Sequence, residues 1–165
     1  MKLVFSIAEP ADAAPLAALH NAVAEEMTRR HGKGPWTLAA TERGVLFGMR
    51  NSRVLLARRG ENIVGALNLQ AKKPWAIDIS YFTPVKKAIY LTNMAVVPKL
   101  QRKGIGTMLL HEAADWVKAW PAFAIRLDAF DHEAGAGMFY AKSGFSERGR
   151  AVYRKAHLVY FELIV

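Results

Sequence analysis

The chain has 165 residues, of which 52% are hydrophobic and 22% charged, and this composition predicts one globular domain spanning residues 1–165. Its 23 basic residues outnumber its 14 acidic residues, giving a net charge of +9, so we expect an anionic partner such as a nucleotide carrying several phosphates. Cysteine is absent, which excludes disulfides and cysteine-ligated zinc and favours a reducing, cytoplasmic location.

Strand and helix signals alternate along the chain. In order, the predicted elements are a strand at 3–8, a helix from 10, a second helix near 41, strands at 53–58 and 62–71, a short strand at 76–81, a strand at 89–97, a helix from 107, a strand at 123–129, a helix at 133–142 and strands at 145–153 and 158–163. This order predicts a mixed α/β domain. The sequence has no stretch of transmembrane length, and Glu9-Pro10 cuts the first apolar run too short for a signal peptide.

The most informative stretch runs from residue 89 to residue 110. An apolar, β-branched run ends at Pro98, which cannot donate to a ladder, and a basic turn containing Gly104 and Gly106 follows. Apolar residues then recur at helical spacing. The first amides of a helix lack intrahelical partners and lie at the positive end of its dipole. This strand, turn and helix therefore predict a site for an anion, of which phosphate is the natural choice.

Several phosphate and metal motifs can be excluded. A dinucleotide-binding fingerprint would need a third glycine where Leu109 stands, and neither glycine of the turn precedes a lysine as a P-loop requires. His111-Glu112 and His132-Glu133 begin like a zinc-protease motif, but the second histidine is missing from both. We therefore expect no metal site.

Two motifs together resemble the GNAT acetyltransferase superfamily. The first is Gln101-x-x-Gly104-x-Gly106 after a strand that ends in Met94-Ala95-Val96. The second combines Ala136, Phe139-Tyr140 and Gly144-Phe145 in the order and spacing typical of the family. The resemblance implies a GNAT-like acyl-CoA acyltransferase fold, with a twisted mixed sheet of six or seven strands flanked by about four helices.

The resemblance also implies the residues that bind the cosubstrate acetyl-CoA. The backbone of residues 94–96 would pair with the pantetheine arm beside an opened sheet, for which a bulge is the usual device, and the amides around residues 102–107 would hold the pyrophosphate. The implied cofactor-binding residues are Met94, Ala95, Val96, Gln101, Arg102, Lys103, Gly104, Ile105, Gly106, Thr107, Glu133 and Tyr140. Glu133 stands where many family members have asparagine.

Two residues are the candidate catalytic groups. The resemblance implies that Tyr140 protonates the departing CoA thiolate. Asp128 occupies a position where some relatives have a catalytic base, although it could also belong to an acidic helix N-terminus. Weaker candidate bases are Glu26, Asp78 and Glu162. Because the chain has no cysteine, we expect a primary amine to attack the thioester directly, without an acyl-enzyme.

Alternatives remain at this stage. A catalytically degenerate acyl-CoA-binding or regulatory module of the same fold would explain Glu133 and the absence of an unambiguous base. A nucleic-acid-binding domain would rest on charge alone, without a reader motif, so we do not expect it. The acceptor amine is not identified by the sequence, and residues 25–41, residues 72–87 and the final hairpin are expected to select it. A homodimer is left open.

Overall fold

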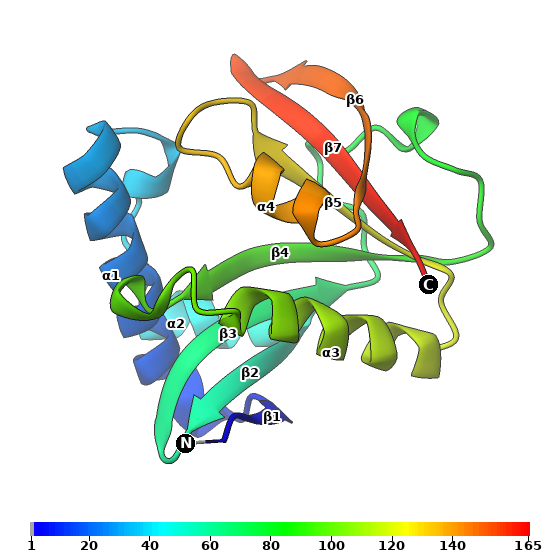
Figure 1. Cartoon of the computed structure of the whole chain (residues 1–165). Coiled ribbons are helices and arrows are strands. Elements are labelled where there is room, and N and C mark those ends of the chain that lie inside the picture. Colours follow the sequence, from blue (N-terminus) through cyan, green and yellow to red (C-terminus); the bar gives the residue numbers. More distant parts are fainter. Residues whose placement is uncertain (1) are drawn as a thin grey trace. The chain divides into compact units, whose positions relative to one another are not determined.

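The computed structural model describes residues 2–165, which form a seven-stranded sheet and four α-helices (Figure 1). The strand order is β1-β2-β3-β4-β5-β7-β6. The elements are β1 (Val4–Ile7), α1 (Ala13–His31), α2 (Glu42–Met49), β2 (Arg53–Arg59), β3 (Asn62–Gln70), β4 (Ala88–Val96), α3 (Ile105–Ala119), β5 (Ala124–Phe130), α4 (Gly137–Lys142), β6 (Ser146–Tyr153) and β7 (Ala156–Ile164). The predicted mixed α/β fold is confirmed.

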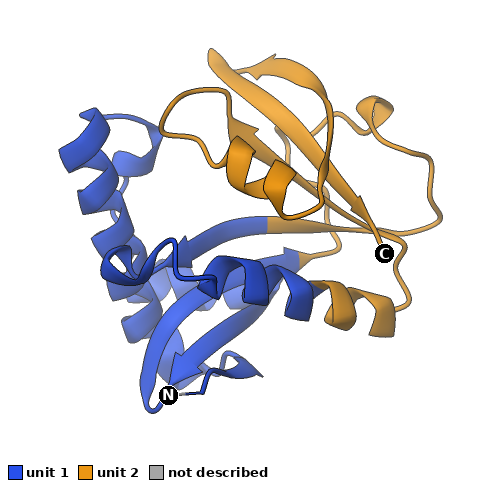
Figure 2. Ribbon diagram, viewed as in Figure 1, with its two compact units in different colours: residues 1–69, 92–113 blue, residues 70–91, 114–165 orange. Residues whose placement is uncertain are grey.

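The chain divides into two compact units (Figure 2). Unit 1 comprises residues up to 69 together with residues 92–113, and unit 2 comprises residues 70–91 and 114–165. β4 and α3 each contribute residues to both units. The prediction of a single domain stays a prediction.

Unit 1 packs helices against the two faces of its strands. One face is an apolar core shared by α1, α2 and the strands, with the buried residues Leu16, Leu19, Val54, Leu56, Ala66 and Ala95 and the partly buried Val45 and Met49 of α2. On the other face α3 lies directly on β3 at Gly65, where an added Cβ would come within 2.8 Å of Leu109 and 3.2 Å of Ile105. A glycine at this position lets the first turns of α3 approach the sheet closely.

The two N-terminal helices begin where the sequence predicts. A 3₁₀ turn, Pro10–Asp12, precedes α1, and the Glu9 N–H donates to the Asp12 carboxylate at 2.9 Å. α2 begins after Thr41, whose hydroxyl accepts a hydrogen bond from the Gly44 N–H at 3.0 Å. The Thr41 side chain thus satisfies an amide that α2 itself leaves without a partner, whereas the Asp12 side chain holds the turn before α1.

Unit 2 is built on the C-terminal strands. β5 and β7 pair antiparallel, β7 and β6 pair antiparallel, and β4 pairs in parallel with β5 at Ala88, Ile89 and Tyr90. β6 lies at the edge of the sheet, and its register shifts between Glu147 and Gly149. The Tyr81 ring occupies the space where a Cβ of Gly149 would stand, because that Cβ would lie 2.5 Å from the ring.

The prediction of a short strand at 76–81 is wrong. Residues 71–87 form a long connection whose one helical turn is the 3₁₀ turn Ile79–Tyr81. Side chains from distant strands hold this connection: the Tyr160 hydroxyl donates to the Ala76 carbonyl, and the Arg126 guanidinium donates to the Thr83 carbonyl at 2.6 Å. These contacts satisfy backbone groups that a ladder would otherwise pair, so the segment needs no strand partner.

The helix predicted at 133–142 begins later, at Gly137. The preceding residues form a turn in which the His132 imidazole accepts a hydrogen bond from the Ala134 N–H at 3.0 Å. A Cβ at Gly135 would overlap the Phe130 carbonyl oxygen, so the chain approaches β5 too closely here for a regular helix. The part of the prediction that covers residues 133–136 is therefore wrong.

The β6–β7 hairpin is tighter than predicted. Its loop consists of Arg154 and Lys155, with φ angles of 47° and 69°. A two-residue loop with both residues left-handed matches the right-handed twist of the strands, but asparagine and glycine are its usual residues. The remaining predicted strands and helices are present, with ends shifted by a few residues.

Candidate active site

The candidate pyrophosphate site in unit 1 is the start of α3. The first bond of the helix that follows the turn runs from the Met108 N–H to the Gly104 carbonyl at 3.0 Å. The amides of Ile105, Gly106 and Thr107 therefore precede the intrahelical hydrogen bonds. Gly104 has φ 86° and no side chain that could cap these donors. An anion is the ligand that such amides and the helix dipole favour.

The basic side chains of the turn suit the same ligand. Lys99, Arg102 and Lys103 are exposed, and Arg102 adopts a left-handed φ of 61° that tightens the turn. Three cations beside free helical amides fit the charge of a pyrophosphate. The hydrogen-bond donors and positive charges of this turn therefore fit the CoA phosphates that the resemblance implies.

Gln101 holds the turn to the strand. Its side-chain amide donates to the Val96 carbonyl at 3.2 Å, which ties the end of β4 to the loop five residues later. Gln101 therefore has a positioning role in unit 1, and its contact with the cofactor stays a prediction.

β4 is irregular just before the residues expected to pair with pantetheine. Asn93 has φ 51°, a left-handed conformation inside a strand that interrupts the regular ladder as a bulge does. Ala95 is buried, whereas Met94 and Val96 are half-buried. On the β3 side the chain is held by a hydrogen bond from the Val97 N–H to the Val64 carbonyl at 3.0 Å. The pairing of residues 94–96 with pantetheine stays a prediction.

Tyr140 lies in an aromatic cluster of unit 2. Its side chain is buried, and its ring centre lies 5.2 Å from that of Phe139, 5.6 Å from Phe145 and 6.0 Å from Phe161. Burial raises the pKa of Tyr140, and the negative charge of Asp128 raises that pKa further. At neutral pH the phenol therefore keeps its proton and can act as a donor.

Asp128 lies on the opposite face of the same strands. It is directly across from Tyr160 in the β5–β7 pairing, so the two side chains share a face, whereas α4 packs on the face of Phe161. Burial raises the pKa of the half-buried Asp128 carboxyl, although a hydrogen bond from its own amide lowers it in part. A carboxylate whose pKa is raised is a stronger base than an ordinary one.

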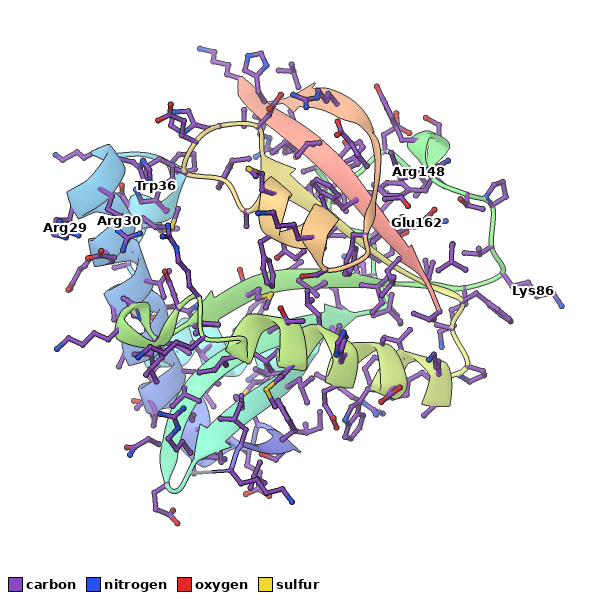
Figure 3. All side chains as sticks on the ribbon, viewed as in Figure 1. Arg29, Arg30, Trp36, Lys86, Arg148 and Glu162 are labelled. Atoms are coloured by element: carbon purple, nitrogen blue, oxygen red, sulfur yellow. The ribbon has the colours of Figure 1, made fainter. Side chains whose placement is uncertain are left out.

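The other candidate carboxylates are engaged. Glu26 accepts hydrogen bonds from Arg29 and Arg30 (the two arginines are labelled in Figure 3), and these bonds lower its pKa to about 2. Asp78 accepts from the amide and hydroxyl of Ser80, and these bonds lower its pKa. Glu162 is paired with a buried arginine. Glu26 and Asp78, whose pKa values are lowered, are therefore poor proton acceptors, and Asp128 is a better candidate base than either.

The comparisons with known proteins decide the family. The model of the acetyltransferase (GNAT) family matches residues 16–145, which is most of the chain. The protein belongs to the GNAT family. A search of curated proteins finds no match to this GNAT chain.

Solved structures share the fold. A GNAT-family acetyltransferase of Streptococcus pneumoniae is 23% identical, with a TM-score of 0.72 over 99% of this chain and 100% of that one. The PaiA N-acetyltransferase of Thermoplasma acidophilum, in complex with coenzyme A, is 15% identical, with a TM-score of 0.74 over 97% and 98%. YncA of Salmonella typhimurium, with its cofactor acetyl-CoA, is 15% identical, with a TM-score of 0.70 over 98% and 93%. At these identities the likeness establishes the GNAT fold.

The described residues of this GNAT chain contain neither a membrane-spanning helix nor a cluster of metal-ligating side chains. Among residues 2–165, no helix combines the length and apolar character needed to cross a bilayer. Within the same residues, no three histidine, aspartate or glutamate side chains gather in a way that could hold a metal ion. Glu133 is exposed in the turn before α4. Its expected contact with the cofactor stays a prediction.

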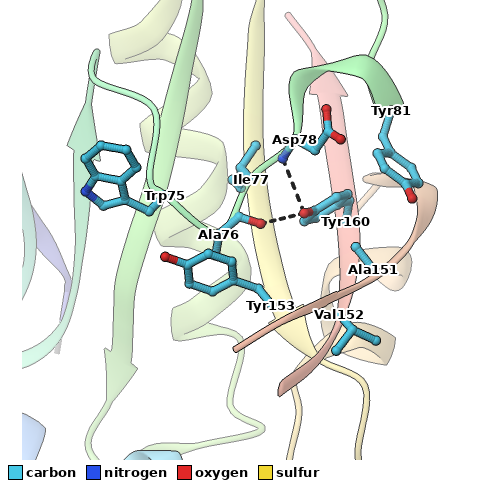
Figure 4. A pocket seen from close by; sticks show the side chains of 9 residues that line it. All are labelled: Trp75, Ala76, Ile77, Asp78, Tyr81, Ala151, Val152, Tyr153 and Tyr160. Atoms are coloured by element: carbon cyan, nitrogen blue, oxygen red, sulfur yellow. Dashed lines mark hydrogen bonds between the residues drawn. The ribbon is translucent and has the colours of Figure 1, made fainter. Parts of the chain in front are cut away.

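Sequence reasoning missed one feature of this GNAT chain, an aromatic pocket in unit 2 (Figure 4). Its volume is about 300 Å³, and it is lined by Trp75, Ala76, Ile77, Asp78, Tyr81, Ala151, Val152, Tyr153 and Tyr160. The sequence did indicate where such a pocket could form, because segment 72–87 and the final hairpin carry its aromatic side chains and were both expected to select the acceptor. Which of them meet depends on the β6–β7 register and could not be read from the sequence.

Proposed function

We propose that this GNAT protein is an acetyl-CoA-dependent N-acetyltransferase that moves the acetyl group to a primary amine. The observation that carries the proposal is the pair formed by Asp128 and Tyr140. A carboxylate with a raised pKa and a protonated phenol, coupled by charge, are the base and the acid that amine acetylation requires. The family match and the CoA or acetyl-CoA bound by PaiA and YncA support acetyl-CoA as the cosubstrate.

The unit 1 residues have a binding role in this proposal. The amides of Ile105–Thr107 and the cations at 99, 102 and 103 hold the pyrophosphate, and Gln101 keeps the turn in position through its bond to Val96. The backbone of residues 94–96 pairs with the pantetheine amides. Bound acetyl-CoA supplies an activated thioester, so the protein needs no nucleophile of its own.

The reaction then consists of one group transfer and two proton transfers. The amine nitrogen bonds to the acetyl carbonyl carbon, and the carbon–sulfur bond breaks. Asp128 accepts the proton that the nitrogen loses, and Tyr140 gives its proton to the departing thiolate. Asp128 then releases its proton to water and the Tyr140 phenolate takes a proton from water, which restores both groups; the raised pKa of the phenol favours its reprotonation. The products are the acetamide and free CoA thiol.

A turnover assay tests the proposal. The purified protein is mixed with acetyl-CoA and a panel of primary amines, and free thiol is measured. We expect thiol release that depends on one amine class, together with CoA binding by calorimetry that weakens as salt rises, because cations meet phosphates. Binding of CoA without thiol release on any amine would favour the degenerate acyl-CoA-binding module. Failure to bind CoA at low salt would refute both the acetyltransferase and the acyl-CoA-binding module.

A further inference from the structure

The pocket in unit 2 has the composition of a site for an aromatic group. Four aromatic side chains line it: Trp75, Tyr81, Tyr153 and Tyr160 (Figure 4). Trp75 is 81% exposed, and Val152, another lining residue, is 63% exposed. An exposed indole beside other apolar groups around a cavity marks a place where a ligand removes apolar surface from water.

The walls of the pocket are held in place before any ligand binds. The Tyr160 hydroxyl donates to the Ala76 carbonyl and accepts from the Asp78 N–H at 3.3 Å. The Tyr160 and Tyr81 rings meet edge to face, with centres 5.2 Å apart. Arg148, which is labelled in Figure 3, donates from its guanidinium to the Tyr81 carbonyl at 3.3 Å, so the aromatic walls are anchored to both β6 and β7. A pre-organised site loses little conformational entropy when a ligand binds.

The charges around the pocket do not favour a polycation as its occupant. Asp78 is the one carboxylate among the lining residues, and the charge of Lys73 acts on it. The Arg154 guanidinium lies 5.3 Å from the centre of the Tyr153 ring, and so already occupies one aromatic face. A single carboxylate among cations can accept one hydrogen bond from a neutral ring donor, whereas several positive charges would be repelled.

The pocket adjoins the candidate base. Tyr160, which forms one wall, lies directly across from Asp128 in the β5–β7 pairing, on the same face. Opposite residues of an antiparallel pair have Cβ atoms about 5 Å apart. An acceptor whose ring fills the pocket can therefore reach Asp128 with an amine on a short chain.

We propose that this pocket binds the ring of an arylalkylamine acceptor, with a ring hydroxyl or ring N–H donating to Asp78 and the single amine directed toward Asp128. This inference rests on the proposed acetyltransferase function. A volume of about 300 Å³ suits one ring and a short chain.

The first test is binding without acetyl-CoA, so that it does not depend on catalysis. Tyramine and 2-phenylethylamine are titrated into the protein while tryptophan fluorescence is recorded, with hexylamine and spermidine as competing chemistries. We expect the arylamines to bind about tenfold more tightly than hexylamine or spermidine, because ring stacking contributes about that much. Equal or tighter binding of hexylamine or spermidine would overturn the inference.

Variants locate the binding to the pocket. Measured by calorimetry, Trp75→Ala should weaken arylamine binding roughly five- to tenfold, whereas Trp75→Phe, which keeps a ring, should restore affinity although the fluorescence change is lost. Ala151→Leu, which fills the pocket, should weaken binding at least tenfold. Phe47→Ala removes another exposed ring (64%, against 81% for Trp75) in α2, outside the pocket, and should leave affinity unchanged. Wild-type affinity in both Trp75→Ala and Ala151→Leu would refute the site.

Thiol release separates this inference from the proposed function. With acetyl-CoA present, tyramine should give turnover, and Asp78→Asn should raise the KM for tyramine severalfold without changing kcat. Arylamine binding in the pocket with no thiol release would support the pocket and refute the acetyltransferase function. Turnover of other amines without arylamine binding would refute the pocket and leave the function standing.

Discussion

Arg126 is the cation that holds the long connection of unit 2, and its removal should destabilise the protein strongly. Its side chain is 7% exposed and Glu162 is 2% exposed, with 3.0 Å between Arg126 Nε and Glu162 Oε2. The same guanidinium donates to the Thr83 carbonyl at 2.6 Å and lies 5.0 Å from the centre of the Phe82 ring. Arg126→Met keeps most of the volume and removes all of these polar contacts at once.

The expected loss follows from the charge that remains. Removing one member of a buried ion pair costs about 3–5 kcal/mol, because the other charge is left in the interior. Arg148, 3.9 Å from Glu162, can recover part of this loss, so we expect a value toward the lower end. For a chain of this length the corresponding fall in Tm is roughly 6–20 °C.

Urea denaturation of wild type and variant measures the difference directly. The matched control is the double variant Arg126→Met/Glu162→Met, which removes both charges and should regain most of the lost stability. The reasoning would be refuted by a single variant within about 1 kcal/mol of wild type, or by a double variant less stable than the single one.

Three further predictions concern single positions. Tyr140→Phe keeps the ring cluster and should lower turnover by roughly 10²–10⁴ with acetyl-CoA affinity unchanged, whereas turnover within a few-fold of wild type would remove Tyr140 from the site. Asp128→Asn should lower turnover yet raise Tm at pH 7. Because the pKa of Asp128 is raised in the folded state, the wild-type protein loses stability as the pH rises through that pKa, and asparagine avoids this loss. A gain in Tm that persists well below pH 4 would show that it does not come from the Asp128 charge. Lys155→Gly should raise stability by about 0.5–1 kcal/mol, because glycine adopts the left-handed turn without strain, and an unchanged or lower unfolding midpoint in urea would show that no strain is stored there.

The parts of the fold that the sequence predicted correctly are those with local causes. α2 begins directly after Thr41, because the Thr41 hydroxyl accepts a hydrogen bond from the amide three residues later. β4 ends before Pro98, which cannot extend a ladder. Gly104 marks the start of α3 because its left-handed backbone, with φ 86°, forms the turn directly before the helix. In each case the residues that define the element lie within one turn of it, so a single sequence contains the whole signal.

The connection at residues 71–87 could not be predicted because its causes are distant. Thr83 is held by Arg126 and Glu162, which lie 43 and 79 residues away, and Ala76 is held by Tyr160, 84 residues away. The sequence predicted a short strand here, but tertiary hydrogen bonds satisfy the backbone instead. The same limit applies to the candidate site: the motifs named Tyr140 and Asp128, whereas the neighbour of Asp128 on β7 depends on a strand register that only the structure gives.

The bulge in β6 also bears on how this protein avoids association through its exposed edge. An edge strand offers unpaired amides and carbonyls to strands of other molecules, which is a route to aggregation. In β6 the register shift at Glu147–Gly149 breaks the flat edge, and Arg150 is fixed in an ion pair with Asp131 at 2.8 Å. A bent edge with charged side chains is a poor template for strand addition. We therefore expect that any self-association uses another surface, and that straightening the bulge would expose this one to intermolecular β-pairing.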